Sequence, residues 1–286
     1  MQKRAGMEFW MKIGKMRKEL RMNRCRKMGM RMVSLLLAMA MLFTMQGVSV
    51  RAEEGDAGER RMPANPVHHC SGVDGDGDLD TTDWSYVYFG SYPQTEITGD
   101  ALTAEITGAD YDENGDAWVD GMKYRRISKS DIDNTEYFGD SEYRYFKWER
   151  IRWKVLQNDG SALFIAADQA VDCKTYHDPG GAITWENCTL RDWLNSSFCD
   201  TAFSNAEQEA IISQDVVNED NLEYGIDGGN DTNDKVHLLS YGEVTNPSYG
   251  FCESCDVASV SRRLKPSDYA HVRGVWISAD SNTEGN

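Results

Sequence analysis

Oxygen-rich side chains at metal-ligand spacing first occur in the stretch GVDGDGDLDTTDW, from Gly72 to Trp84. Aspartates recur at every second position, and Gly77 stands where a sharp turn is needed. Carboxylate oxygens at alternating positions of a turning loop suit calcium, a hard cation that prefers oxygen ligands. The candidate ligands in this loop are Asp74, Asp76, Asp80 and Asp83.

The spacing resembles the calcium loop of dockerin modules, but it departs from that pattern. Gly72 stands at the position of the first ligand aspartate, and the chain has no acceptable second copy of the loop. The segment that follows, WSYVYFGSYPQ, is strand-like and broken by Gly90 and Pro93, whereas the pattern requires a helix. We therefore expect weak calcium binding or none, and we favour a solvated acidic turn ahead of the domain.

A second oxygen-rich loop, DGGNDTND, spans residues 227–234. Glycine, asparagine and aspartate are first of all turn-forming residues, which predicts a turn here. A cation site remains the alternative, and its candidate ligands are Asp227, Asn230, Asp231 and Asp234. No cofactor is assigned from the sequence, and calcium is the one that these loops leave open.

Catalysis finds no supporting motif in this chain. The five histidines lie outside HExxH and GxSxG contexts, and His237, in the apolar run KVHLL, is expected to be a strand residue rather than a base. Cys252 and Cys255 form a lone CxxC that could hold zinc together with His68–Cys70, but a second CxxC at zinc-site spacing is lacking. We assign no catalytic and no cofactor-binding residue.

Hydrophobic spacing predicts an α+β domain after Trp84. Charged and apolar residues alternate through Arg150–Val155, as in a strand with one buried face, whereas Ala162–Asp168 is a continuous apolar run typical of a strand buried on both faces. Asp120–Gly121 is the turn of a predicted hairpin, and Asn114–Gly115 is a second turn signal.

Helical spacing begins behind Thr184, a possible N-cap, and leaves Arg191 and Asp192 on the solvent face. Ser204 and Glu207 form a capping box that opens a second helix. The apolar face of the first helix comprises Leu190, Trp193, Leu194 and Phe198. A strand in KVHLLSYGEV and a short helix in PSDYAHVRG are predicted to follow.

The first fifty residues have the composition of a secretory signal peptide. Met1 to Met32 carries eleven basic and two acidic residues, and the apolar run Val33–Met45 follows. This run is shorter than a membrane span of about 20 residues, so we expect cleavage before Glu53 rather than a membrane anchor. The protein is then secreted or on the cell surface, with residues 53–83 as an acidic linker and 84–286 as the domain.

Charge and cysteine content limit the class of protein. The chain has a formal charge of −17, and the part after residue 52 keeps 18 basic and 45 acidic residues, a charge of −27. Nucleic-acid affinity comes from basic residues at the phosphates, so this balance argues against nucleic acid and against an anionic membrane surface. The six cysteines after residue 52 can form three disulfides, whose pairing stays open, or they can remain reduced thiols. They are Cys70, Cys173, Cys188, Cys199, Cys252 and Cys255.

Several long phrases resemble the DUF6273 family of secreted bacterial proteins, in the expected order along roughly 86–286. They are YFGSYPQTEI, YRYFKWERIRWKVLQNDGSALFIAADQAVDC, TWENCTLRDWLN, TAFSNAEQEAI, GGNDTNDKVHLLSYGEVTNP and SDYAHVRGVW. The resemblance implies a fold like C-type lectins and sulfatase-modifying (formylglycine-generating) domains, with two helices packed on short antiparallel strands. It also implies further strands after Asn286, so we expect the fold to be incomplete at its C-terminus.

The leading interpretation is non-catalytic binding of a ligand or partner, protein or glycan, at the cell surface. An enzyme related to the formylglycine-generating oxidases is one alternative, although Cys252 and Cys255 do not match the cysteine motif of that family. A structural module of the cell wall is the other alternative.

Overall fold

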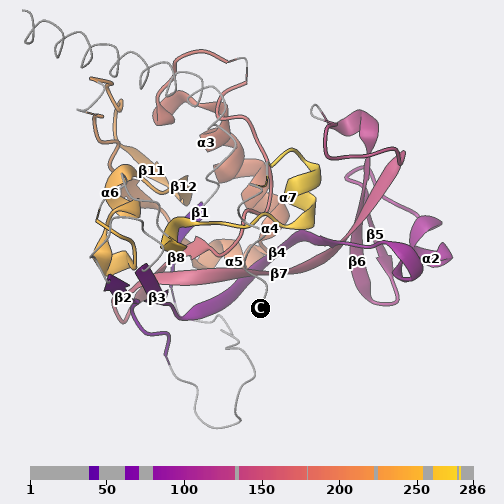
Figure 1. Cartoon of the computed structure of the whole chain (residues 1–286), viewed down its shortest axis with the longest axis horizontal. Helices are drawn as coiled ribbons and strands as arrows, with labels where there is room; N and C mark the ends of the chain where they lie inside the picture. Colours follow the sequence, from indigo (N-terminus) through magenta and orange to yellow (C-terminus); the bar gives the residue numbers. More distant parts are fainter. Residues whose placement is uncertain are drawn as a thin grey trace, which may run out of the picture. The chain divides into compact units, whose positions relative to one another are not determined.

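The computed structural model describes residues 39–44, 62–70, 80–132, 135–178, 180–221, 225–253, 260–275 and 277. The chain divides into a short unit, Met1–Leu35, and a main unit, Leu36–Asn286, to which all described residues belong. The main unit combines antiparallel sheets with short helices (Figure 1), which confirms the predicted mixture of elements. Among the described residues, no helix is long and apolar enough to cross a membrane.

The main sheet contains eight of the described strands, and all its pairings are antiparallel. Its order is β12–β1–β8–β7–β6–β5, with β4 also paired to β7 and β9 to β1. The strands are β1 Met39–Thr44, β4 Tyr86–Glu96, β5 Asp116–Val119, β6 Met122–Ser128, β7 Tyr143–Asn158, β8 Ala162–Ala167, β9 Ile211–Ile212 and β12 Val236–Leu238.

Two smaller sheets have two strands each. One pairs β2 (Val67–Cys70) with β3 (Asp80–Asp83), and the other pairs β10 (Gln214–Val216) with β11 (Thr232–Asp234). The α-helices are short: α2 Ala104–Thr107, α3 Thr189–Trp193, α4 Cys199–Ala202, α5 Asn205–Ala210, α6 Tyr241–Val244 and α7 Asp268–Val272. A π-helical turn, Leu194–Phe198, joins α3 to α4.

Strands β7 and β8 carry the centre of the core. Ile151 and Trp153 of β7 are buried as their alternation predicts, and all six residues of β8 are buried. The prediction is wrong for Lys154, which is buried instead of facing solvent. Its ammonium lies 3.4 Å from the Asp168 carboxylate and 4.5 Å from the centre of the Trp84 ring. These contacts offset part of the cost of burying a charge.

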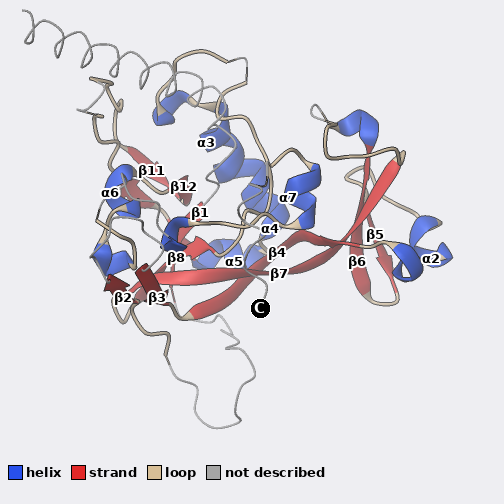
Figure 2. Ribbon diagram, in the orientation of Figure 1, coloured by secondary structure: helices blue, strands red, loops and turns tan. Residues whose placement is uncertain are grey.

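The helical segment from α3 to α4 packs on the main sheet (Figure 2). Its predicted apolar face is correct for Leu190, Leu194 and Phe198, which are buried, while Trp193 is only half-buried. The predicted cap is wrong. Thr184 precedes a 3₁₀ turn and makes no capping hydrogen bond, whereas α3 starts after Cys188, whose Sγ accepts the backbone N–H of residue 191 at 3.4 Å.

Other local signals are confirmed. Asp120 and Gly121 have φ of 50° and 77° and form the turn between β5 and β6, because both residue types tolerate positive φ. The Ser204 and Glu207 side chains and backbone N–H groups complete the predicted capping box of α5. At Gly115, a Cβ would lie 2.3 Å from the carbonyl oxygen of Arg126, so this close turn requires glycine.

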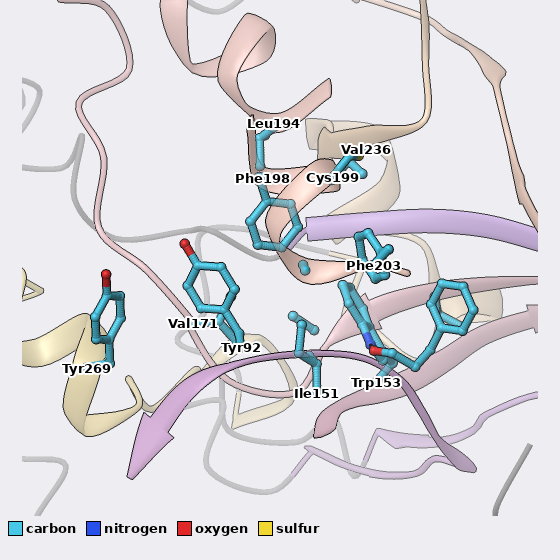
Figure 3. Close-up of a cluster of buried hydrophobic side chains, with 14 of the residues drawn as sticks. Tyr92, Ile151, Trp153, Val171, Leu194, Phe198, Cys199, Phe203, Val236 and Tyr269 are labelled. Atoms are coloured by element: carbon cyan, nitrogen blue, oxygen red, sulfur yellow. Dashed lines mark hydrogen bonds between the residues drawn. The ribbon is translucent and has the colours of Figure 1, made fainter. Parts of the chain in front are cut away.

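Aromatic rings fill the core where these helices meet the sheet (Figure 3). The Phe198 ring lies 5.4 Å from Tyr92 and 5.8 Å from Phe203, centre to centre. The Trp153 indole donates a hydrogen bond of 2.7 Å to the carbonyl of Phe89, so its polar group is satisfied inside the core.

Strand β1 comes from the apolar run that the sequence predicts as the centre of a removable signal peptide. It pairs with β8 on one side and with β12 and β9 on the other. Cleavage before Glu53 would therefore remove a strand of the main sheet, and cleavage itself stays a prediction. The described part does not include residues 1–38, 45–61 and 278–286. The expectation that the fold is incomplete at its C-terminus therefore stays a prediction.

Candidate functional site

A cavity of about 480 Å³ is lined by residues of β4, β6, β7, α3, α4 and the α7 region, and of the loops before β5, after β6 and after β8. Charged, hydroxyl and aromatic side chains make up most of the lining. Ligand pockets are usually lined mainly by apolar side chains with a few placed polar groups. This lining is more polar than that, so it suits a small polar ligand better than an apolar one. The cavity is the candidate functional site.

Asp172 is the buried acid of the cavity, with 2% of its surface exposed. Its Oδ2 accepts a hydrogen bond of 2.7 Å from the Tyr92 hydroxyl, and its Oδ1 accepts one of 2.7 Å from the Cys173 backbone N–H. The Nε of Arg273 lies 3.3 Å from Oδ1 and brings an opposite charge. These three donors replace the water that the carboxylate loses on burial.

Two tyrosines of the cavity keep their hydroxyl protons. Burial, and next the negative charge of Asp172, raise the pKa of Tyr92 well above its ordinary value and that of Tyr269 to about 12. The two rings pack edge to face with their centres 5.8 Å apart, and their hydroxyls point to the same side (Figure 3). A protonated phenol can donate a hydrogen bond, so these groups are suited to binding.

Arg125 is held in one orientation by Asp116. Its Nε and Nη2 donate to the two carboxylate oxygens, each at 2.7 Å. The Lys123 ammonium, at 2.9 Å, and the Trp148 indole, at 3.0 Å, also contact Asp116. Burial alone would lower the pKa of Arg125, but its hydrogen bonds to Asp116 outweigh this and raise the pKa overall. The cavity therefore presents a fixed cation.

Aromatic faces and long cations form the more exposed part of the lining. The Lys174 ammonium lies 5.5 Å from the centre of the Trp193 ring, and the Arg126 guanidinium lies 4.8 Å from that of Tyr143. Trp193 is half-buried and Tyr143 is 37% exposed. The lining as a whole has four acidic and four basic residues, so it suits a polar ligand of low net charge.

In the loop at residues 227–234, for which the sequence predicts a turn and leaves a cation site as the alternative, Asp234 is turned into the protein. Asp234 is 2% exposed, and its carboxylate accepts hydrogen bonds from Trp185 at 2.9 Å, Thr232 at 2.7 Å and Arg191 at 2.7 Å. The sequence predicts Arg191 on the solvent face, but this bond and one to the Glu186 carbonyl hold its side chain against the protein, and it is half-buried.

The other three candidate ligands of that loop make turn and surface contacts. Asp227 accepts the N–H of Gly229 at 2.8 Å, and Asp231 accepts the N–H of Asn218 at 3.0 Å. The Asn230 amide donates to the Glu186 carboxylate at 3.0 Å. These are the contacts expected of turn-forming residues.

The first acidic loop is described only in part. Asp80 and Asp83 begin and end β3, and the exposed Asp83 carboxylate lies 3.5 Å from Nε2 of His69. Asp74 and Asp76 lie outside the described residues, so weak calcium binding here stays a prediction. Within the described ranges, no group of three or more histidine, cysteine, aspartate or glutamate side chains is arranged to hold a metal.

Four cysteines have described side chains, and all are free thiols: Cys173, Cys188, Cys199 and Cys252. Burial raises the pKa of Cys188, and it raises that of Cys199 to about 11. Of the suggested zinc ligands, His68 contacts the Thr82 hydroxyl through Nδ1 at 2.8 Å, and Cys255 lies outside the described part. His237 is a buried residue of β12, as predicted.

Sequence reasoning did not single out Tyr92, Arg125, Asp172 or Arg273. Asp172 is 80 residues from Tyr92 and 101 from Arg273, and no local spacing connects residues so far apart. One signal was available in the phrase AVDC. A lone aspartate among apolar residues indicates a buried acid, and charged residues are rarely buried without a partner.

Residues 159–274 match the DUF6273 family model. That family is described as a domain of unknown function, and the match confirms the predicted resemblance over this segment. The DUF6273 segment runs from the turn before β8 to the end of the α7 region, and it supplies Asp172, Lys174, Trp193, Tyr269 and Arg273 to the cavity. No curated protein and no solved structure matches the chain.

Proposed function

We propose that this protein binds a glycan of low net charge at the cell surface, without catalysing a reaction, and that the cavity beside Asp172 is the site. The observation that carries the proposal is the composition of the lining. Buried ion pairs hold its charged groups in place beside the partly exposed rings of Trp193 and Tyr143.

This composition corresponds to the chemistry of a sugar ring, which has C–H groups on its faces and hydroxyls along its edge. The rings of Trp193 and Tyr143 offer contact area for a sugar face. The Lys174 ammonium and the protonated hydroxyl of Tyr269 offer donors for sugar hydroxyls. Equal numbers of acidic and basic residues in the lining favour a neutral sugar over a strongly anionic ligand.

Rigidity also favours binding. Asp172 joins Tyr92 to Arg273, and Asp116 fixes Arg125 through two hydrogen bonds. Groups that are ordered before the ligand arrives lose less entropy on binding. The raised pKa values of the two tyrosines keep them as donors rather than nucleophiles.

The finer architecture and the location belong to the same proposal. A domain like C-type lectins and sulfatase-modifying proteins is supported by an antiparallel sheet with short helices packed on it. Export is supported by the basic and then apolar composition of residues 1–52. An exported domain would present the cavity to glycans of the cell envelope.

Binding can be tested with a panel of neutral and uronic-acid oligosaccharides of two to four sugars. Calorimetry and tryptophan fluorescence should show binding of a neutral member. Trp193→Leu and Lys174→Ala should each weaken it at least about tenfold, the cost of one or more lost contacts. Trp118→Ala is the matched control, because Trp118 is 70% exposed and lies outside the lining.

Two results would contradict the proposal. One is that no neutral sugar in the panel binds at millimolar concentration. The other is that Trp193→Leu and Trp118→Ala weaken the binding equally. Preferred binding of the uronic-acid members would refute the charge argument but keep the cavity as a glycan site.

A further inference from the structure

The place of β1 in the main sheet is a slot with a strand on each side. Residues 40–44 pair with β8, where Met41 lies opposite Ile165 and Phe43 opposite Leu163. On the other side, residues 39–41 pair with β12 and residues 42–43 with β9. Both sides are antiparallel, so one extended segment closes the sheet between β8 and the strands β9 and β12.

The walls of this slot are buried on both faces of the sheet. Leu163 and Ile165 of β8 belong to the main core, and Phe164 and Ala166 belong to a second cluster on the alternate positions. Val236, in β12, is also buried. If the slot were empty, the β8 backbone groups that now pair with β1 would lose their described partners, and these apolar rows would be uncovered.

The segment in the slot has the sequence MAMLFT and comes from the run that precedes the expected cleavage site. Five of its six residues are apolar, as a strand between two buried faces requires. The same residues therefore satisfy two demands, since an export signal and a central strand both need a short apolar run.

We propose that this slot is a strand-acceptor site. In the precursor it is occupied by Met39–Thr44, and in the processed chain it binds an extended apolar segment of another polypeptide, antiparallel to β8. Main-chain hydrogen bonds on both sides supply the affinity, and alternate side chains enter the two apolar clusters, as in recognition by strand addition. The second half of the proposal rests on the predicted cleavage.

The test uses the full chain with residues 46–52 replaced by a seven-residue site for a specific protease, cut only after folding. The nicked protein is incubated with a labelled peptide of residues 37–46, flanked by lysines for solubility. A matched peptide carries Leu42→Pro, because proline removes a ladder hydrogen bond and is not accommodated in a central strand.

The two halves should co-elute after the cut, and the labelled peptide should exchange into the slot. The proline peptide should bind roughly a hundredfold more weakly. If the N-terminal half is removed without replacement, the melting temperature should fall by more than about 5 °C, and the peptide should restore it.

Three results would overturn the proposal. They are an unchanged melting temperature after the N-terminal half has left, equal binding of both peptides, and halves that stay together without exchanging either peptide. Cleavage in the cell is scored separately by N-terminal sequencing of the exported protein, so a retained signal segment would refute processing without changing the result with the peptides.

Discussion

Replacing Asp234 tests whether its loop binds a metal ion or whether the Asp234 carboxylate has a structural role. Its buried carboxylate accepts hydrogen bonds from Trp185, Thr232 and Arg191. Asp234→Ala would leave the Trp185 indole N–H and the Thr232 hydroxyl buried without an acceptor, at a cost of about 1–3 kcal/mol each. It would also remove the carboxylate that pairs with Arg191. The two donors together give about 2–6 kcal/mol, so Asp234→Ala should lower the free energy of unfolding by about that amount, a large part of the 5–15 kcal/mol that is typical of a domain.

The assay is urea unfolding of the full chain, with calcium and with a chelator. Asp234→Asn keeps the shape and one acceptor oxygen, so it should cost only about 1–2 kcal/mol, and it keeps the test measurable if the alanine variant does not fold. Asp231→Ala is the matched control, since Asp231 is exposed and accepts one N–H. It should change stability by about 0.5 kcal/mol.

Two outcomes would refute this reasoning. A loss of about 0.5 kcal/mol or less for Asp234→Ala would mean that the three hydrogen bonds do not hold the loop. A loss that appears only with calcium present would mean that the carboxylate acts as a metal ligand.

Three further predictions concern acid stability, packing and calcium. Burial alone would raise the pKa of Glu207, but hydrogen bonds from Ser204, Gly90 and Arg150 outweigh this and lower it below 4.5. The ionised Glu207 side chain should therefore contribute fully to the free energy of unfolding above pH 4.5, and this contribution should disappear as the pH falls through the lower pKa of the folded state. Glu207→Gln should flatten the acid side of a curve of stability against pH. An unchanged acid side would contradict this prediction. Trp193→Ala should cost about 1–3 kcal/mol in urea unfolding, less than the 3–5 kcal/mol of a fully buried tryptophan, because the ring is half-buried; a larger loss would show that it is a core residue. Calorimetry on the full chain should show weak calcium binding or none at residues 72–83, and submicromolar affinity abolished by Asp74→Ala with Asp76→Ala would support a dockerin-like loop.

Several elements of the fold could be predicted because their causes are local. The Ser204–Glu207 capping box and the Asp120–Gly121 turn each depend on residues within one turn of chain. The buried strand β8 is visible as an apolar run, since a strand covered on both faces needs apolar residues at every position. The prediction of Thr184 as the cap is wrong because a 3₁₀ turn comes before the helix proper.

The cavity could not be predicted in the same way. Tyr92, Asp172 and Arg273 meet only because β4, the loop after β8 and the end of α7 come together. Lys154 likewise has the alternation of an exposed residue, yet Trp84 and Asp168 cover it. Such contacts depend on packing between distant segments, which hydrophobic periodicity does not record.

By itself, the sequence determined the mixture of strands and helices, the family resemblance of its second half and the acidic character of the chain. These follow from residue composition and from spacing within a few residues. Only the tertiary structure decided which charged residues face one another, and it placed Met39–Thr44 between β8 and β12. A short apolar run has the same appearance in a signal peptide and in a central strand, and only the partners available for its backbone distinguish the two.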